Sequence, residues 1–238
     1  MTPELMILIL SAASLGFFHT LAGPDHYLPF IMMAWARKWS LRKTSLITFL
    51  CGLGHIASSV VLGLVGIAFG LVAKKLELFE SARGSIAAWL LIAFGLVYMV
   101  WGIRRALRNK PHMHSHVHFE TGQHTHLHSH NDEHVHIHEE IKAPVNITPW
   151  VLFTIFVFGP CELLIPVLMY PAAEESLFGM LLVTAVFGIT TISTMMVIVL
   201  FAVKGVHIVR FNKLERFTHA IAGGTILLCG LAIQFLGL

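Results

Sequence analysis

The chain has 238 residues, of which 56% are hydrophobic and only 12% are charged, whereas about a quarter of the residues of ordinary soluble domains are charged. With a mean hydropathy of +0.76, this much apolar surface cannot be buried in one globular core, which excludes a soluble enzyme and a nucleic-acid-binding protein. The formal net charge is +3, and the three cysteines, Cys51, Cys161 and Cys229, all lie in apolar stretches, which excludes a secreted domain held together by disulfides.

Six apolar stretches are long enough for a membrane-spanning helix, which needs about 20 residues. They run from about residues 5 to 36, 44 to 73, 85 to 103, 148 to 172, 176 to 203 and 217 to 238. Because an isolated strand or loop cannot face lipid, each stretch is expected to be helical. The sequence therefore predicts an all-α integral membrane protein with six transmembrane helices.

The first and fourth stretches carry the same kind of interruption, a Gly-Pro pair followed by a second proline. Proline removes a backbone donor and clashes with the preceding turn, so both helices are predicted to break or kink. The residues that form these breaks are Gly23, Pro24, Pro29, Gly159, Pro160 and Pro166. With three stretches in each half, the halves would form a 3+3 inverted repeat, an arrangement typical of transporters. The predicted units are residues 1–108, a loop over 109–147, and residues 148–238.

The lysines and arginines are distributed unevenly between the two sides of the predicted membrane layout. The loops after the first, third and fifth stretches hold 13 of them, and the other side holds only Lys74, Lys75 and Arg83. The positive-inside rule then predicts a plasma or inner membrane protein with those three loops in the cytoplasm and both termini outside. In this layout no lysine or arginine lies in the inner part of a span.

Ionisable residues inside a membrane are costly and usually functional. Five are predicted here: His19, Asp25, His26, His55 and Glu162. Without a basic partner, two carboxylates require a cation, and neutral imidazoles are good ligands for nickel, cobalt, copper and zinc. Asp25 and His26 follow the first break and Glu162 follows the second, which predicts an intramembrane metal site. Cys161 fits either a soft ligand of this site or a small core residue.

Histidines are concentrated in the loop between the third and fourth stretches. They alternate strictly with other residues in three blocks, a composition typical of metal binding, with Zn²⁺ one candidate. The residues are His112, His114, His116, His118, His124, His126, His128, His130, His134, His136 and His138. In an extended chain the histidines of each block share one face. A small meander and a disordered loop both fit the pattern.

The stretch from His19 to His26, with Gly23-Pro24-Asp25-His26 at its end, resembles a signature of the nickel/cobalt transporter superfamily, in particular its six-span UreH-like branch. Gly54-His55 resembles the next motif of that family. The Gly159-Pro160-Cys161 motif and the histidine-rich loop are similar to features of its nickel/cobalt efflux proteins. The resemblance implies that His19, Asp25, His26 and His55 ligate metal, whereas the role of Glu162 is inferred from its charge alone.

The main interpretation is a secondary transporter of Ni²⁺ or Co²⁺ that is not an enzyme, with import and export both open. The expected partners are the lipid bilayer, the metal ion, a metallochaperone or nickel-enzyme maturation protein, and a second copy of the chain. One alternative is a sulfite-type anion exporter, which should avoid Asp25 and Glu162. Another is a thiol-redox membrane protein, which needs a cysteine in each half, whereas Asp25 occupies the position opposite Cys161. An intramembrane metalloprotease is disfavoured because no His-Glu-x-x-His motif is present.

Overall fold

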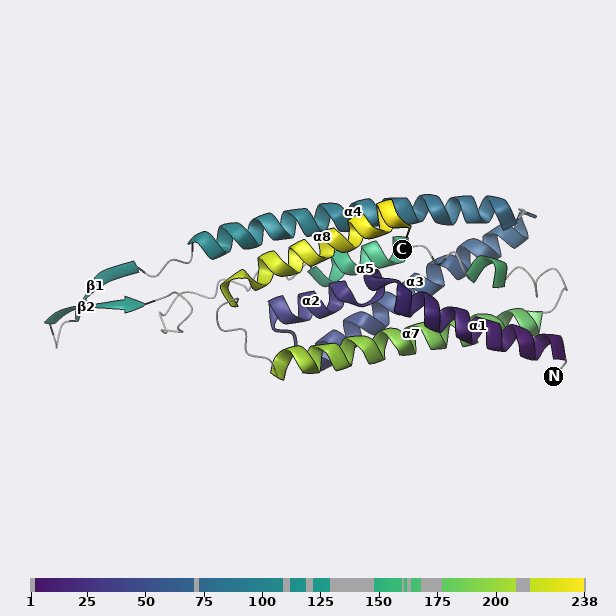
Figure 1. Cartoon of the computed structure of the whole chain (residues 1–238), viewed down its shortest axis with the longest axis horizontal. Coiled ribbons are helices and arrows are strands. Elements are labelled where there is room, and N and C mark those ends of the chain that lie inside the picture. Colours follow the sequence, from purple (N-terminus) through teal and green to yellow (C-terminus); the bar gives the residue numbers. More distant parts are fainter. Residues whose placement is uncertain are drawn as a thin grey trace.

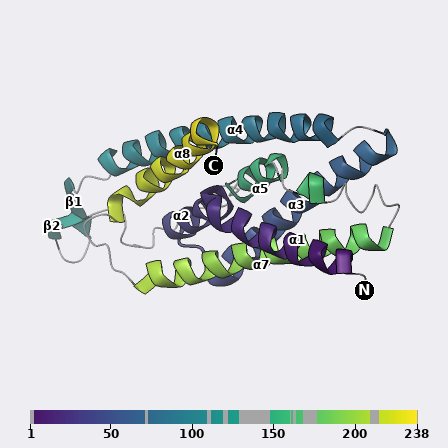
Figure 2. The same cartoon turned by 45° about the vertical axis from the view of Figure 1, so that its right-hand side comes forward.

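The computed structural model describes residues 3–70, 73–108, 112–118, 122–128, 148–159, 161, 164–167, 177–208 and 215–237. These residues form an elongated bundle of helices with a two-stranded hairpin at one end (Figures 1 and 2). The helical elements are α1 (Pro3–Ala22), η1 (Pro24–His26), α2 (Leu28–Arg37), α3 (Leu41–Ala68), α4 (Ala73–Arg108), α5 (Thr148–Phe158), α7 (Leu177–Ile208), η2 (Glu215–Phe217) and α8 (Thr218–Leu236). The strands are β1 (His112–His118) and β2 (Gly122–His128).

Five of the described helices are long and apolar enough to cross a membrane, over Pro3–Ala22, Leu41–Ala68, Lys74–Arg108, Leu177–Gly205 and Thr218–Leu236. Helix α5 is apolar but has only 11 residues. Large apolar side chains face outward, including Leu177, Phe201 and Leu236, which are 72%, 74% and 73% exposed. The prediction of a helical integral membrane protein is confirmed, whereas the described residues contain five candidate spans and not six.

Both predicted helix breaks are present. Helix α1 ends at Ala22, Gly23 has an extended backbone, and one 3₁₀ turn leads into α2, which has a proline in its first turn. Helix α5 ends at Phe158, just before Gly159, and Pro166 lies in a short helical stretch over residues 164–167. The local effect of Gly-Pro on the backbone therefore sets the end of each helix.

Helix α4 is much longer than the predicted third stretch. It begins at Ala73 and runs for 36 residues, so Glu80 and Arg83 lie within it and not in a loop. The predicted start of the third stretch at Ser85 is therefore too late, and Arg83 lies within the candidate span Lys74–Arg108. Glu80 and Arg83 form an ion pair three residues apart on this helix, and pairing offsets the cost of placing each charge there.

Small residues let pairs of helices approach closely, as is common in membrane proteins. Helix α8 lies along α4, and α1 lies along α7, in both views (Figures 1 and 2). A Cβ added to Gly16 of α1 would lie 3.0 Å from the carbonyl oxygen of Phe187. Helix α3 packs against both α5 and α7, so α3 runs through the middle of the bundle and its buried face is well placed for a site.

The histidine loop begins with an antiparallel hairpin. Its register pairs His112 with His128, His114 with His126 and His116 with His124. The first two histidine blocks therefore face each other across the hairpin. The ends of α2, α4 and α7 and the start of α8 also lie at the hairpin end of the bundle (Figure 1), so the helix ends that carry Arg37 and Arg108 are found there.

Candidate functional site

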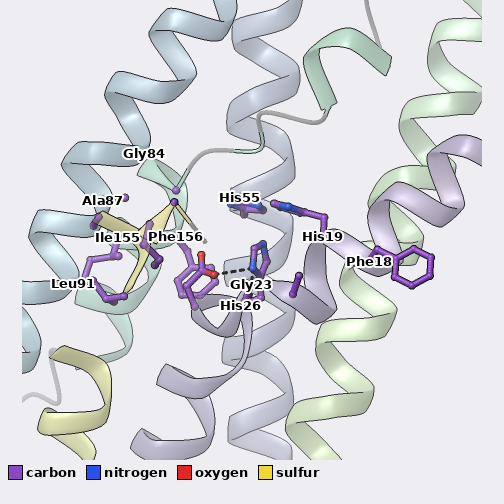
Figure 3. Close-up of a pocket in the computed structure, with 16 residues that line it drawn as sticks. Phe18, His19, Gly23, His26, His55, Gly84, Ala87, Leu91, Ile155 and Phe156 are labelled. Carbon is purple, nitrogen blue, oxygen red and sulfur yellow. Dashed lines mark hydrogen bonds and ion pairs between the residues drawn. The ribbon is translucent and has the colours of Figure 1, made fainter. Parts of the chain in front are cut away.

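Three histidines from three different segments meet in the middle of the bundle. His19 lies in the last turn of α1, His26 ends η1, and His55 lies about halfway along α3. One ring nitrogen from each lies within 4.8 Å of the other two. The ring centroid of His26 lies 4.6 Å from that of His19 and 5.2 Å from that of His55, and Figure 3 shows the three rings side by side. The structure thus brings together three of the residues predicted to ligate metal.

The first helix break creates this convergence. The N–H of Gly23 donates to the carbonyl oxygen of His19 at 3.0 Å, and the chain then turns so that His26 faces back toward His19. A Cβ at Gly23 would lie 2.6 Å from Nδ1 of His26 and 2.8 Å from Oδ1 of Asp25. The turn therefore needs a residue without a side chain, because any larger residue would displace the two polar groups beside it.

Asp25 forms a hydrogen bond with His26 and is not one of the residues whose ligand atoms converge. Its Oδ1 lies 3.1 Å from Nδ1 of His26, and the carbonyl oxygen of Gly23 also lies 3.1 Å from that nitrogen. Two oxygen acceptors at Nδ1 favour the tautomer that carries its proton there. Nε2 of His26 is then left with a free lone pair, and a carboxylate behind a histidine commonly orients and strengthens a metal ligand.

Four further ring nitrogens of the three histidines are buried and have no hydrogen-bond partner among the described residues. They are Nε2 of His19, Nε2 of His26 and both nitrogens of His55. Burying polar atoms without partners is costly, so such groups call for a physical explanation. A cation bound by three imidazoles would satisfy one nitrogen on each ring, and first-row transition metals prefer such ligands.

The histidines line a cavity of about 420 Å³. Residues of α4 and α5 form much of the rest of its wall, including Gly84, Ala87, Leu91 and Phe156 (Figure 3), and Ile233 of α8 also lines it. Gly159, at the second break, also lines the cavity, and a Cβ there would lie 3.2 Å from Nδ1 of His55. The two breaks, predicted separately from the sequence, therefore meet at one cavity.

Cys161 lies apart from the histidine cluster. Its side chain is fully buried in an apolar cluster with Ile56, Leu164 and Phe187. Cys51 and Cys229 belong to a different apolar cluster, and all three cysteines are free thiols. The structure thus places Cys161 at the second break without bringing it to the ring nitrogens.

Several predicted residues lie outside the described residues. They are Pro160, Glu162, His130, His134, His136 and His138.

Sequence reasoning missed the ion pair formed by Glu80 and Arg83. The Glu80 side chain is fully buried, and that of Arg83 is 18% exposed. The signal was the spacing, because opposite charges three residues apart lie on one face of a helix and can neutralise each other. Reading Ser85 as the start of the third stretch hid that spacing.

Among known families, a model described as "Cytochrome C biogenesis protein transmembrane region" matches residues 28–232. No curated protein and no solved structure matches the chain. The matched range begins after His19 and His26 and includes His55, Gly159 and Cys161.

This match corrects the resemblance stated above. The matching family differs from the nickel/cobalt transporter superfamily, so the assignment to that superfamily is wrong, and so is the Ni²⁺ or Co²⁺ transport function that it supported. The physical reason is that the motif over residues 19–26 lies before the matched range. A cluster of ligand-type residues is a local feature, and unrelated membrane proteins can arrive at it independently.

Proposed function

Because the chain belongs to the family of cytochrome c biogenesis protein transmembrane regions, we propose that it is a membrane-embedded redox protein, with a transition-metal ion at its centre. Haem is attached to c-type cytochromes through cysteine thiols, so their assembly needs redox chemistry that keeps those thiols reduced. The family match supports the redox role. The convergence of His19, His26 and His55, with their unpartnered nitrogens, is the observation that supports the metal centre.

The cysteines give little support to a disulfide that forms and breaks within the membrane. Such a relay needs two thiols in contact, whereas Cys161 lies in a different apolar cluster from Cys51 and Cys229. The residue of the first break that corresponds in sequence to Cys161 of the second break is Asp25, which has no thiol. Copper or iron held by imidazoles gains and loses one electron at a time. Two successive transfers through a histidine-bound ion, each supplied by a reduced electron donor, would therefore provide the two electrons that, with two protons, reduce one disulfide to two thiols.

The charges around the centre suit a cation. The Asp25 carboxylate lies 3.1 Å from His26 and supplies negative charge next to the ligands. Arg83 is paired with Glu80, so its positive charge is largely cancelled. A divalent ion bound by three neutral imidazoles would therefore be partly neutralised by Asp25.

The first prediction tests the metal centre on the full-length chain purified in detergent, with Cu²⁺ as the probe and with the eleven histidines of the loop replaced by serine, because the loop would bind Cu²⁺ as well. The same background, called wild type for this purpose, serves every Cu²⁺ and Co²⁺ measurement below. We expect His26→Ala to weaken Cu²⁺ binding at least about 100-fold, because it removes a ligand together with its carboxylate support. His219→Ala is the matched control, since His219 hydrogen-bonds to the Tyr98 hydroxyl at 2.8 Å and lies outside the cluster. Equal Cu²⁺ affinity in the wild type and His26→Ala would show that the three histidines do not form a metal site.

The redox role is tested by measuring haem-stained c-type cytochromes in cells whose only copy carries each variant. We expect His26→Ala to lower the cytochrome level and His219→Ala to leave it unchanged. A thiol function of Cys161 is a second candidate, favoured by its position at the second break, where its N–H donates to Oε2 of Glu80 at 3.1 Å. If Cys161→Ser lowers the cytochrome level while His26→Ala does not, the thiol and not the metal centre carries the redox role.

We also propose that the two halves form an inverted repeat and that the hairpin end faces the cytoplasm. The meeting of Gly23 and Gly159 at one cavity supports the repeat. The positively charged helix ends at the hairpin end of the bundle, which include Arg37 and Arg108, support the orientation (Figure 1).

The hairpin register yields a second prediction, on metal binding by the loop. Residues opposite each other in an antiparallel register have Cβ atoms about 5 Å apart, so we propose that histidines paired in this register share one metal ion. In a His26→Ala background, we expect Ser115→Pro to lower the number of bound Zn²⁺ ions, because it disrupts the ladder and keeps every histidine. Ser115→Ala is the control, and elemental analysis after dialysis is the measurement. Equal Zn²⁺ content in Ser115→Pro and Ser115→Ala would show that the loop histidines bind the metal without the strand pairing.

A further inference from the structure

The Arg83 guanidinium joins three helices at the second break. It is paired with Oε1 of Glu80 on its own helix, α4. Its Nη2 donates to the Ser58 hydroxyl of α3 at 2.8 Å. The same nitrogen donates to the carbonyl oxygens of Val157 and Gly159 at 2.9 and 3.3 Å. Arg83 therefore binds the carbonyls that α5 leaves unpaired where it ends.

Glu80 holds the other side of the same break. Its Oε1 accepts from Arg83, and its Oε2 accepts from the N–H of Cys161 at 3.1 Å. Two charged side chains of α4 thus bind the backbone immediately before and after Pro160. Three backbone groups at this break, the carbonyls of Val157 and Gly159 and the N–H of Cys161, therefore have charged partners, and such hydrogen bonds are stronger than neutral ones.

The held backbone lies directly against the histidine cluster. Gly159, whose carbonyl binds Arg83, would place a Cβ 3.2 Å from Nδ1 of His55. On the α3 side, the Ser58 hydroxyl accepts from Arg83 and donates to the carbonyl oxygen of His55 at 2.8 Å. Arg83 is therefore connected to the His55 segment by two routes, one through α5 and one through Ser58.

We propose that Glu80 and Arg83 are positioning residues that set the distance between the second helix break and His55, and thereby the geometry of the histidine centre. This inference rests on the proposed metal centre for its functional consequence. Lysine has a single point charge and cannot reproduce the planar fork of donors, so Arg83→Lys keeps the charge but loses the bridge between the helices.

The matched control is Arg37, which also joins several helices but lies outside the cavity. Its Nε donates to the Tyr98 hydroxyl of α4 at 3.0 Å, and its Nη2 donates to the Thr148 hydroxyl of α5 at 3.2 Å. Arg37→Lys therefore removes a comparable bridge at another place in the bundle. A merely structural role would make the two variants behave alike.

The experiment has two readouts on the full-length chain purified in detergent, in the background whose loop histidines are replaced by serine, so that Co²⁺ reports only the histidine cluster. The first is the visible absorption spectrum and affinity of bound Co²⁺, which report ligand geometry. We expect Arg83→Lys to shift the Co²⁺ bands and to weaken binding about tenfold, and Arg37→Lys to leave both unchanged. The second readout needs no metal and follows maleimide labelling of each cysteine by mass spectrometry. We expect Cys161 to react at least tenfold faster in Arg83→Lys, with Cys51 and Cys229 as internal references.

The two readouts separate the inference from the proposed function. If the wild type binds no Co²⁺ but Cys161 becomes reactive only in Arg83→Lys, the metal centre fails and the positioning of the break stands. If the wild type binds Co²⁺ and Arg83→Lys changes neither the bands nor the Cys161 reactivity, the positioning role is overturned. A faster reaction of all three cysteines in both lysine variants would also overturn it, because that result reports general loosening of the bundle.

Discussion

Gly223→Ala is expected to prevent α8 from packing against α4. A Cβ at this position would lie 2.2 Å from the backbone nitrogen of Met99 and 2.8 Å from the carbonyl oxygen of Gly95. Both are backbone atoms of α4, so no side chain can rotate away, and the helices must separate. Overpacking that shifts backbone costs about 3 kcal/mol or more, which we expect to appear as a strong loss of native protein after heating in detergent, measured by size-exclusion chromatography.

Gly224→Ala is the control for this substitution on the same helix. The nearest atom to a Cβ at Gly224 is the sulfur of Met99 at 3.5 Å, an ordinary contact. Because alanine favours a helix over glycine by roughly 0.5–1 kcal/mol, Gly224→Ala should be as stable as the wild type or slightly more so. If the two alanine variants denature at the same temperature, Gly223 of α8 is not packed against the backbone of α4.

The second large effect is expected at the histidine centre, from a substitution that removes no ligand. In Gly23→Ala the new methyl group would lie 2.6 Å from Nδ1 of His26 and 2.8 Å from Oδ1 of Asp25. Either the ring or the carboxylate must move, so the ring nitrogens no longer converge. Disturbing the support of a metal ligand typically costs 10- to 100-fold in affinity, and we expect a loss of about 100-fold in Cu²⁺ binding measured by competition titration.

Gly205→Ala serves as the control for Gly23→Ala, since nothing lies within 4 Å of a Cβ at Gly205. This variant should bind Cu²⁺ like the wild type. Unchanged affinity in Gly23→Ala would mean that the turn tolerates a side chain and that the close approach of Gly23 to His26 is not needed for binding.

The features predicted correctly from the sequence are those with local causes. Gly23-Pro24 and Gly159-Pro160 predict helix ends because proline acts on its own turn, and the helices end at Ala22 and Phe158. His19, His26 and His55 were recognised as candidates because ionisable residues are rare in apolar stretches. Their meeting at one cavity could not be derived from spacing, because His55 reaches it through the packing of α3.

The features predicted wrongly depend on tertiary partners. Arg83 is predicted to lie in a loop because the third stretch is taken to begin at Ser85, yet Glu80, Ser58 and the α5 carbonyls bind it inside the bundle. The 3.1 Å contact of Asp25 with His26 likewise depends on the backbone turn at Gly23, which spacing alone does not give, and the role of Asp25 as a metal ligand stays a prediction. The family was assigned from a short motif, whereas the pattern that identifies it extends over residues 28–232.

The position of His55 about halfway along α3 would make ion binding at the histidine cluster depend on the transmembrane voltage. Helix α3 is long and apolar enough to cross a membrane, so in a bilayer that α3 spans, an ion entering the site from either side would cross about half of the transmembrane voltage. Moving one charge across the whole membrane changes its energy by roughly 2.3 kcal/mol per 100 mV, so a divalent ion crossing half of it gains or loses about the same amount. That energy corresponds to about a fifty-fold change in occupancy. In an energised membrane the centre would therefore fill or empty with the voltage, and a change in the oxidation state of its ion would respond to that voltage as well.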